Sequence, residues 1–288
     1  MMSRPVVVGI DGSAPSAAAA QWAAREAYRN GCRLRMVHVS AMPSGDLEPE
    51  ERAGTQLPDF AVRLRERIVS ALPGLEVSCE QLPGAASYVL AAAGERGRLL
   101  VLGSRGLGGF AGPLVGSVGL RTAAHAGCPV ILVRSATVRG DSASGEVVVG
   151  VDSARPSDAA LGFAFEEAER RGAALRVVEG RRPSRGPYLT KGPVDQEQIR
   201  RSLAAAELVR LQDALSHWRE KFPGVDAEAE VIDQGGARAL VEASRTAGLV
   251  VLGRSALGHP LASPRLGPVA HAVLHHAHSP VAVVPHAA

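Results

Sequence analysis

Short apolar runs alternate along the first half of the chain with longer segments in which apolar positions recur at helical spacing. The apolar runs, at residues 6–10, 34–39, 75–82, 99–102 and 129–133, predict five strands, and the first is Val-rich enough for burial on both faces. Residues 17–30, 60–72 and 86–96 predict helices, and a further helix begins at Gly116. This alternation predicts an α/β fold.

Strands that alternate with helices form a parallel sheet with helices on both faces, and right-handed crossovers leave few doubly wound orders. We expect the strand order 3-2-1-4-5. In such sheets a ligand binds beyond the carboxyl ends of the strands, where the strand order reverses. That point lies between the strand ending at Asp11 and the strand ending at Gly103, so the sequence predicts a crevice there.

The pattern then restarts after a small, polar linker at residues 134–146. Residues 6–38 and 147–179 align without gaps and are identical at 17 of 33 positions, and LVVLG at 249–253 mirrors LLVLG at 99–103. An internal duplication of this length predicts two domains, residues 1–138 and 146–288, each with a five-stranded, doubly wound parallel sheet. The strands at 130–133 and 281–284 should be sheet edges, and we expect them to pair as a pseudo-twofold within the chain.

Composition narrows the class of protein. The chain has 288 residues, of which 46% are hydrophobic and 3% aromatic, so its cores should be built from Ala, Val and Leu. No apolar run reaches the roughly 20 residues that span a bilayer, and no signal peptide is recognisable, so we expect a cytoplasmic protein without a membrane partner. The net charge of +3 is spread along the chain and predicts no nucleic-acid partner. The three cysteines fit no metal spacing and predict buried, reduced thiols.

Residues suited to ligand binding follow the strand at 99–102. A loop with Gly103 and Gly106 leads to Gly116-Ser117 at the start of a helix. Glycines let the backbone approach an anion, and the unpaired N–H groups of a first helical turn point toward it, so this arrangement favours phosphate binding. A flexible structural turn is the alternative. Arg105, in the same loop, either reaches a phosphate or stays solvated.

The spacing of Gly103, two residues, Gly106, nine residues and Gly116-Ser117 resembles the ATP-binding signature of the universal stress protein family. The stretches VVVGIDGS (6–13), LRMVHVS (34–40) and HAGCPVILVR (125–134) resemble that family as well. The resemblance implies that the chain binds ATP, alone or with Mg²⁺. The cofactor-binding residues that it implies are Asp11, Val39, Gly103, Gly106, Gly116, Ser117 and Val118; no catalytic or metal-ligating residue is expected.

The resemblance places Asp11 on an adenosine-contacting aspartate and Val39 on a valine whose backbone meets adenine. Asp11 would otherwise cap the following helix, and Val39 would otherwise be a core residue. Val118 is expected to serve mainly in packing.

The second copy departs from this pattern. Asp152, Gly253 and Gly267 are kept, whereas Ala256, Pro268 and Gly180 stand where the first copy has Gly106, Ser117 and Val39. We therefore expect a weakened or empty second site.

Four histidines close the last helix of the second copy. His271, His275, His276 and His278 suggest a metal site, but no carboxylate or cysteine completes a ligand set nearby. We favour the interpretation that these histidines are cations at the negative end of a helix dipole.

The family resemblance implies nucleotide-gated signalling in stress adaptation through protein partners. Separately, we expect a homodimer, although the sequence shows no distinct interface for it. ATP would order the glycine loop and the long loops at 41–59 and 181–198, which are candidate lids. The alternative is a weak ATPase or a nucleotidyl-transferring enzyme on a related fold. The sequence has no Walker A, HxGH or SGGxDS motif, so we expect no enzyme.

Overall fold

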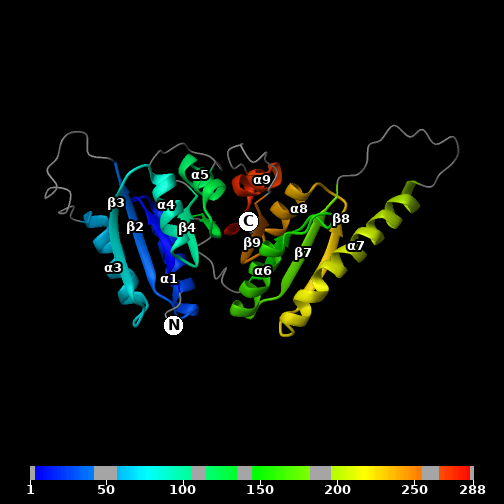
Figure 1. The fold of residues 1–288 in the computed structure, drawn as a ribbon, viewed down its shortest axis with the longest axis horizontal. Helices are drawn as coiled ribbons and strands as arrows, with labels where there is room; N and C mark the ends of the chain where they lie inside the picture. Colours follow the sequence, from blue (N-terminus) through cyan, green and yellow to red (C-terminus); the bar gives the residue numbers. More distant parts are fainter. Residues whose placement is uncertain are drawn as a thin grey trace.

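The computed structural model describes residues 4–41, 57–104, 115–134, 145–181, 196–254 and 266–285 (Figure 1). The first repeat contains β1 (Val6–Ile10), α1 (Ala14–Arg29), β2 (Leu34–Ser40), α3 (Asp59–Ala71), β3 (Val77–Pro83), α4 (Ala86–Glu95), β4 (Leu99–Gly103), α5 (Ser117–His125) and β5 (Val130–Val133). The second repeat contains β6 (Val147–Gly150), α6 (Asp158–Arg171), β7 (Leu175–Gly180), α7 (Gln196–Lys221), β8 (Ala227–Ile232), α8 (Gly236–Ala243), β9 (Leu249–Gly253), α9 (Pro268–His276) and β10 (Val281–Val284).

The strands form one ten-stranded sheet in the order β3-β2-β1-β4-β5-β10-β9-β6-β7-β8. Within each repeat the five strands are parallel and follow the predicted order 3-2-1-4-5. The two halves join through antiparallel pairing of β5 with β10, in which Ile131 lies opposite Ala282. This pairing confirms the predicted pseudo-twofold, and it removes two apolar edges from solvent.

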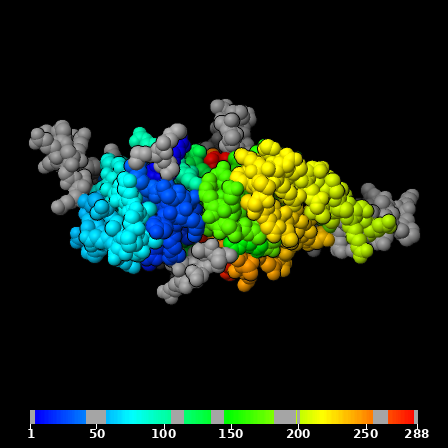
Figure 2. Space-filling model, turned by 90° about the horizontal axis from the view of Figure 1, so that it is seen from below, coloured from blue at the N-terminus to red at the C-terminus, as the bar shows by residue number. Residues whose placement is uncertain are grey.

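Helix boundaries follow local capping chemistry. The Ser13 side chain accepts a hydrogen bond from the Ser16 amide, so α1 begins at Ala14, three residues before the expected start. Helix α7 has 26 residues against 13 in α3, and Figure 2 shows it running along the second repeat and projecting past it. The central parts of the expected lids, residues 42–56 and 182–195, lie outside the described residues.

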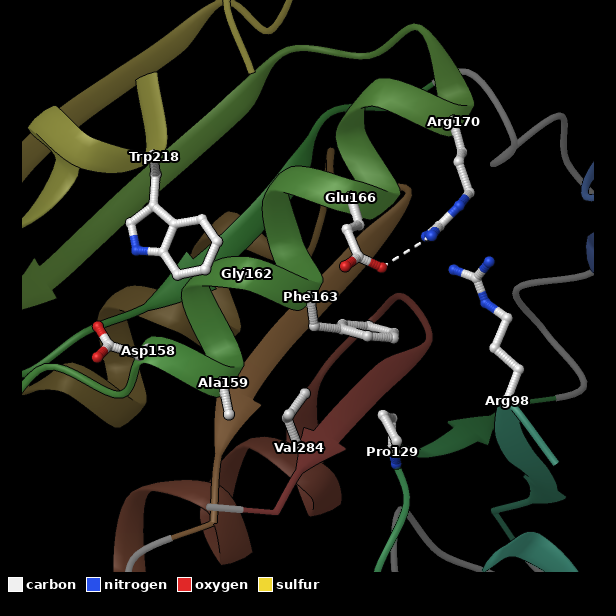
Figure 3. Close-up of a pocket in the computed structure, with 10 residues that line it drawn as sticks. All are labelled: Arg98, Pro129, Asp158, Ala159, Gly162, Phe163, Glu166, Arg170, Trp218 and Val284. Atoms are coloured by element: carbon white, nitrogen blue, oxygen red, sulfur yellow. Dashed lines mark hydrogen bonds and ion pairs between the residues drawn. The ribbon is translucent and has the colours of Figure 1, made fainter. Parts of the chain in front are cut away.

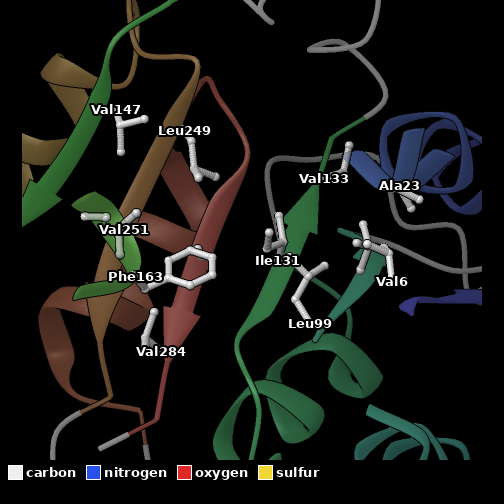
Figure 4. Packing of buried hydrophobic residues seen from close by; sticks show 14 of the residues in the cluster. Val6, Ala23, Leu99, Ile131, Val133, Val147, Phe163, Leu249, Val251 and Val284 are labelled. Carbon is white, nitrogen blue, oxygen red and sulfur yellow. The ribbon is translucent and has the colours of Figure 1, made fainter. Parts of the chain in front are cut away.

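Two apolar layers run across both repeats. One cluster joins α1, α3, α6 and α7 to one sheet face, and the other joins α4, α5, α8 and α9 to the opposite face. Figure 4 shows the first layer crossing the β5–β10 junction, with Ile131 on one side and Phe163 on the other. Alanine, valine and leucine dominate both clusters, as predicted from the low aromatic content.

All three cysteines are free. Cys32 and Cys128 are buried as predicted, whereas Cys79 on β3 is only partly buried. Burial raises the pKa of the Cys128 thiol to about 11, so this side chain is an uncharged packing group. Within the described ranges, none of the helices has the length and hydropathy needed to cross a membrane.

A buried ion cluster holds α1 against α6 at the junction. Glu26 and Glu167 occupy equivalent positions in the two repeats, and their side chains are 1% and 0% exposed. Arg171 bridges them: its Nη2 lies 2.8 Å from Glu26 Oε2, and its Nε lies 3.2 Å from Glu167 Oε2. The same guanidinium stacks over Trp22, 5.4 Å from the ring centroid.

Two further arginines complete the neutralisation of Glu167. Arg98 Nη2 lies 2.8 Å and Arg170 Nη1 3.2 Å from Glu167 Oε1. Both arginines line a cavity of about 410 Å³ between the repeats, together with Phe163 and Trp218 (Figure 3). Burial and the nearby Glu26 raise the pKa of Glu167, and the three arginines oppose that shift.

Each repeat also caps a helix of the other. Arg134, which follows β5, donates to the carbonyl oxygens of Leu274 and His275 at the end of α9. Arg254, which follows β9, donates to Ala126 O at 2.7 Å and to Ala123 O at 3.4 Å, at the end of α5. Guanidinium groups satisfy orphan carbonyls and complement the helix dipole there. The helices α5 and α9 therefore have fixed positions across the junction.

Replacing Arg171 tests the buried cluster. Arg171→Met keeps the side-chain bulk but leaves Glu26 and Glu167 facing each other in the interior, so we expect the free energy of unfolding at pH 7 to fall by about 3–5 kcal/mol. The loss should be larger at pH 8 than at pH 5. A carboxyl whose pKa is raised in the folded state holds a proton that the unfolded chain releases above about 4.5, so stability falls as pH rises. Urea unfolding at both pH values measures this.

The matched control is Arg155→Met, because the Arg155–Asp152 pair is 69% and 56% exposed and should contribute less than about 1 kcal/mol. Adding Glu26→Gln to Arg171→Met should recover part of the lost stability. Equal losses in the two arginine variants would refute the role assigned to the cluster.

Candidate functional site

Three strand ends meet where the strand order of the first repeat reverses. Strand β1 lies between β2 and β4, and all three run in the same direction. Asp11 directly follows β1, Val39 is the penultimate residue of β2, and Gly103 is the last residue of β4. The structure therefore brings these three predicted residues to one edge of the sheet, as expected for a ligand crevice.

The Asp11 carboxylate is half-buried at this edge. Its Oδ1 accepts a hydrogen bond of 2.9 Å from the Ser13 amide, and no described residue hydrogen-bonds Oδ2. The N-cap of α1 is Ser13, so Asp11 does not cap that helix, and the alternative considered for it is wrong. One carboxylate oxygen thus stays available to an incoming hydrogen-bond donor.

His38 and Phe60 flank Asp11, and sequence reasoning did not single them out. His38 Nδ1 lies 3.0 Å from Ile10 O, and its ring meets the Phe60 ring edge-on at 5.2 Å between centroids. Phe60 lies against Gly12, whose φ of +84° favours glycine and where a Cβ would approach the ring to 3.2 Å. The signal available in the sequence was a histidine near the carboxyl end of a mostly apolar strand, next to the strand end where a ligand is expected.

Val39 and Gly103 both have packing roles. Val39 is partly buried against the apolar layer of α4 and α5, and it pairs with Leu82 on β3. A Cβ on Gly103 would lie 2.7 Å from the Pro15 carbonyl carbon and 2.9 Å from the Ser16 nitrogen. The close approach of α1 to β4 therefore accounts for glycine at position 103, and contact of either residue with a ligand stays a prediction.

The start of α5 carries the other predicted residues. Gly116 is the N-cap, with no side chain to accept from the first-turn amides, and its own N–H donates to Ser104 O at 2.8 Å. Ser117 is exposed, and Val118 exposes 40% of its surface. The prediction that Val118 serves mainly in packing is therefore wrong. The amides of Ser117 and Val118 are therefore open to an anion. Gly106 and Arg105 lie outside the described residues.

The equivalent crevice of the second repeat is built differently. Asp152 is kept, but its Oδ1 accepts from the Ala154 amide at 3.1 Å, and its Oδ2 lies 3.7 Å from Arg155. Glu179 replaces His38; its Oε1 accepts from the amide and hydroxyl of Ser153, and its Oε2 is buried without a hydrogen bond. A second carboxylate at this edge opposes the approach of an anionic ligand.

Gly180 and Pro268 change the second crevice further. A Cβ on Gly180 would lie 2.3 Å from the Cα of Gly236, so the start of α8 fills the space that a Val39-like side chain would need. Pro268 opens α9 after the N-cap Gly267, and it removes both a hydroxyl and an amide donor from the first turn. Gly253 keeps its place at the end of β9, and Ala256 lies outside the described residues.

The histidines of α9 do not behave as a group of cations. His275 is 7% exposed, and its Nδ1 accepts a hydrogen bond from the Val115 amide, so the ring is neutral and its interpretation as a cation was wrong. Among the described residues, no group of three or more His, Cys, Asp or Glu side chains has a geometry that could hold a metal ion.

Alanine substitutions test the packing role of Gly103. Gly103→Ala forces a Cβ against backbone atoms of α1, so we expect a loss of about 1–3 kcal/mol in the free energy of unfolding. Gly253→Ala is the matched control, because its Cβ would meet side-chain atoms rather than backbone, those of Ser157 at 3.1 Å and Ala160 at 3.6 Å, and it should cost at most about 1 kcal/mol. Urea unfolding measures both, and a smaller loss for Gly103→Ala than for its control would contradict the packing role.

Comparison with known proteins agrees with this architecture. The model of the universal stress protein family matches residues 2–134 and again residues 145–285. The universal stress protein Rv2005c of Mycobacterium tuberculosis is 35% identical over 301 residues, covering 98% of this chain and 99% of the relative. Rv2623 of the same organism is 31% identical over 292 residues, covering 96% and 95%.

Solved structures show the same fold. A universal stress protein from Archaeoglobus fulgidus DSM 4304 superposes with a TM-score of 0.62, covering 99% of both chains at 16% identity. A functionally unknown protein from Pseudomonas aeruginosa PAO1 gives a TM-score of 0.63, also at 16% identity, and covers 99% of this chain and 93% of its own. With two matches to the family model and relatives similar over nearly their full length, the chain belongs to the universal stress protein family as a tandem, two-domain member.

Proposed function

We propose that the first repeat, residues 1–138, binds ATP, with Mg²⁺ as an accompanying ion, and that the nucleotide gates signalling to protein partners in stress adaptation. The crevice of the second repeat, residues 146–288, is weakened or empty. The observation that carries this proposal is the combination of a half-buried aspartate at the strand switch point with a helix whose first turn lacks a side-chain cap. A homodimeric state and a cytoplasmic location belong to the proposal and rest on the sequence alone.

Each residue of the first crevice has a chemical role in this proposal. Asp11 Oδ2 accepts a hydrogen bond from a ribose hydroxyl, and the backbone of Val39 meets the adenine. The Ser117 hydroxyl and the first-turn amides of α5 hold the phosphates, and Gly103, Gly106 and Gly116 let the backbone come close to them. Anionic phosphates are stabilised there by the positive end of the α5 dipole.

Gating follows from where the phosphates bind. The first turn of α5 faces the nucleotide, while its last turn is capped by Arg254 of the second repeat. A nucleotide bound at one end of α5 thus acts on an element that contacts the other repeat. The equilibrium between two states shifts only by the difference in their ATP affinities, so gating requires partners that distinguish the two states.

A substitution borrowed from the second repeat tests the phosphate site. Ser117→Pro should leave the fold intact, because Pro268 occupies the equivalent position and Gly116 already has the extended conformation, φ −69° and ψ 156°, that a residue before proline prefers. Loss of the hydroxyl and of one amide donor should weaken ATP binding at least about tenfold. Isothermal titration calorimetry measures the affinity.

Ser117→Ala is the intermediate variant. It loses only the hydroxyl, and we expect it to weaken binding several-fold and less than the proline variant. Bulky residues at Gly106 and Gly116 should abolish ATP retention. Affinities equal to the unmodified chain in all of these variants would remove the proposed site.

The number of bound nucleotides tests the division between the repeats. Equilibrium dialysis should give one ATP per chain, since the second crevice carries Glu179 and lacks the Ser117 hydroxyl and amide. Asp11→Asn should weaken this binding, and Asp152→Asn should not. Two equivalents of ATP would refute the empty second crevice, and turnover of many ATP per minute would favour an enzyme.

A further inference from the structure

One hydrogen bond links the second repeat to the candidate phosphate site of the first. The Val115 amide donates to His275 Nδ1 at 3.1 Å, across 160 residues of sequence, and both residues are buried. Val115 directly precedes Gly116, the N-cap of α5, whose amide is held by Ser104 at 2.8 Å. Two consecutive amides of the first repeat thus fix the backbone that leads into α5, and their acceptors come one from each repeat, His275 from the second and Ser104 from the first. The helices α5 and α9 lie side by side there (Figure 1).

This link runs in one direction only. Under the alignment of Gly116 with Gly267, the first-repeat equivalent of His275 is Ala124, which has no acceptor side chain. The reciprocal Arg134 and Arg254 caps, in contrast, occur in both directions. The repeat whose crevice has lost its donors therefore supplies the extra contact to the repeat that keeps them.

The bond requires a neutral ring. Nδ1 accepts only when it carries no proton, so the hydrogen of the neutral imidazole is on Nε2. In the protonated ring Nδ1–H would point at the Val115 N–H, and the bond would be lost. The switch between these states lies within the pH range in which histidine titrates.

The surroundings of His275 favour the neutral form. Its ring centroid lies 4.5 Å from that of His271 and 6.4 Å from that of His276, and Arg134 donates to the His275 carbonyl. Burial first, and then His271, His276 and Arg134, lower the pKa of His275 below 6.5. No carboxylate is among the charged groups that act on it in the described part of the chain.

We propose that His275 is a positioning residue for the nucleotide site of the other repeat: it holds Val115, and so the first turn of α5, only while it is neutral. ATP affinity then decreases in acid as His275 takes up a proton. This inference rests on the proposed ATP site, and it adds to that site a pH-dependent control exerted by the second repeat.

Calorimetric ATP binding by the full chain at pH 5.5, 6.5 and 7.5 tests the inference. His275→Asn places an amide oxygen at the position of Nδ1, accepts the same hydrogen bond and does not titrate. His275→Leu keeps the bulk without an acceptor. Because the terminal phosphate of ATP also titrates, affinities are compared between variants at each pH.

At pH 7.5 the Asn variant should bind ATP within about twofold of the unmodified chain, and the Leu variant roughly three- to tenfold more weakly. At pH 5.5 the unmodified chain should have lost roughly three- to tenfold relative to the Asn variant. His278→Asn removes an exposed histidine that is not among the groups acting on the pKa of His275, and it should follow the unmodified chain. Parallel pH profiles of the unmodified chain and the Asn variant, or full affinity of the Leu variant, would overturn the inference.

Hydrogen exchange at the Val115 amide gives a readout that needs no nucleotide. Its protection factor should be high at pH 7.5, fall at pH 5.5 in the unmodified chain, and remain high in the Asn variant. If no variant binds ATP while this protection behaves as expected, the proposed ATP site fails and the cross-repeat contact stands. If protection is indifferent to pH and to His275→Leu, the positioning role itself is refuted.

Discussion

The antiparallel pairing of β5 with β10 is the constraint on which the rest of this structure depends. Each five-stranded sheet would otherwise end in an apolar strand with unpaired backbone groups, and such an exposed edge promotes aggregation. Pairing the two edges completes the backbone hydrogen bonds and relates the repeats by a pseudo-twofold. That symmetry in turn dictates which surfaces meet, because equivalent helices must approach each other across the junction.

The approach of equivalent helices brings two buried carboxylates together, and residues that differ between the two repeats compensate their repulsion. Glu26 and Glu167 are equivalent, so the pseudo-twofold brings two carboxylates together in a buried place. Arg171 and Arg98 neutralise them, and neither has a symmetric counterpart, since Asn30 and Gly248 occupy the equivalent positions. Two identical copies would lack this asymmetry. A covalent tandem lets each repeat carry an arginine that the other lacks, Arg98 in the first and Arg171 in the second.

Sequence patterns predicted most of the fold and part of the candidate site. Runs such as Val6–Ile10 and Leu99–Gly103 are continuous and apolar, so their burial and the strand order follow from general rules for parallel sheets. The repeat itself made the β5–β10 pairing predictable. The positions of Asp11 at a strand end and of the start of α5 were also predicted, because turn chemistry at strand ends is local.

The parts that escaped prediction all depend on contacts between distant segments. The sequence gives no sign that position 103 faces the backbone of Pro15, or that Glu26 meets Arg171 across 145 residues. His275 stands among three other histidines and looks like one more charge at a helix end. Only the packing of α9 beside α5 makes it a buried acceptor for Val115. The pseudo-twofold requires symmetric contacts at the junction, so the contacts that break the symmetry stand out against them. One of these is the hydrogen bond from the Val115 amide to His275, through which, in our proposal, the second repeat positions the nucleotide site of the first.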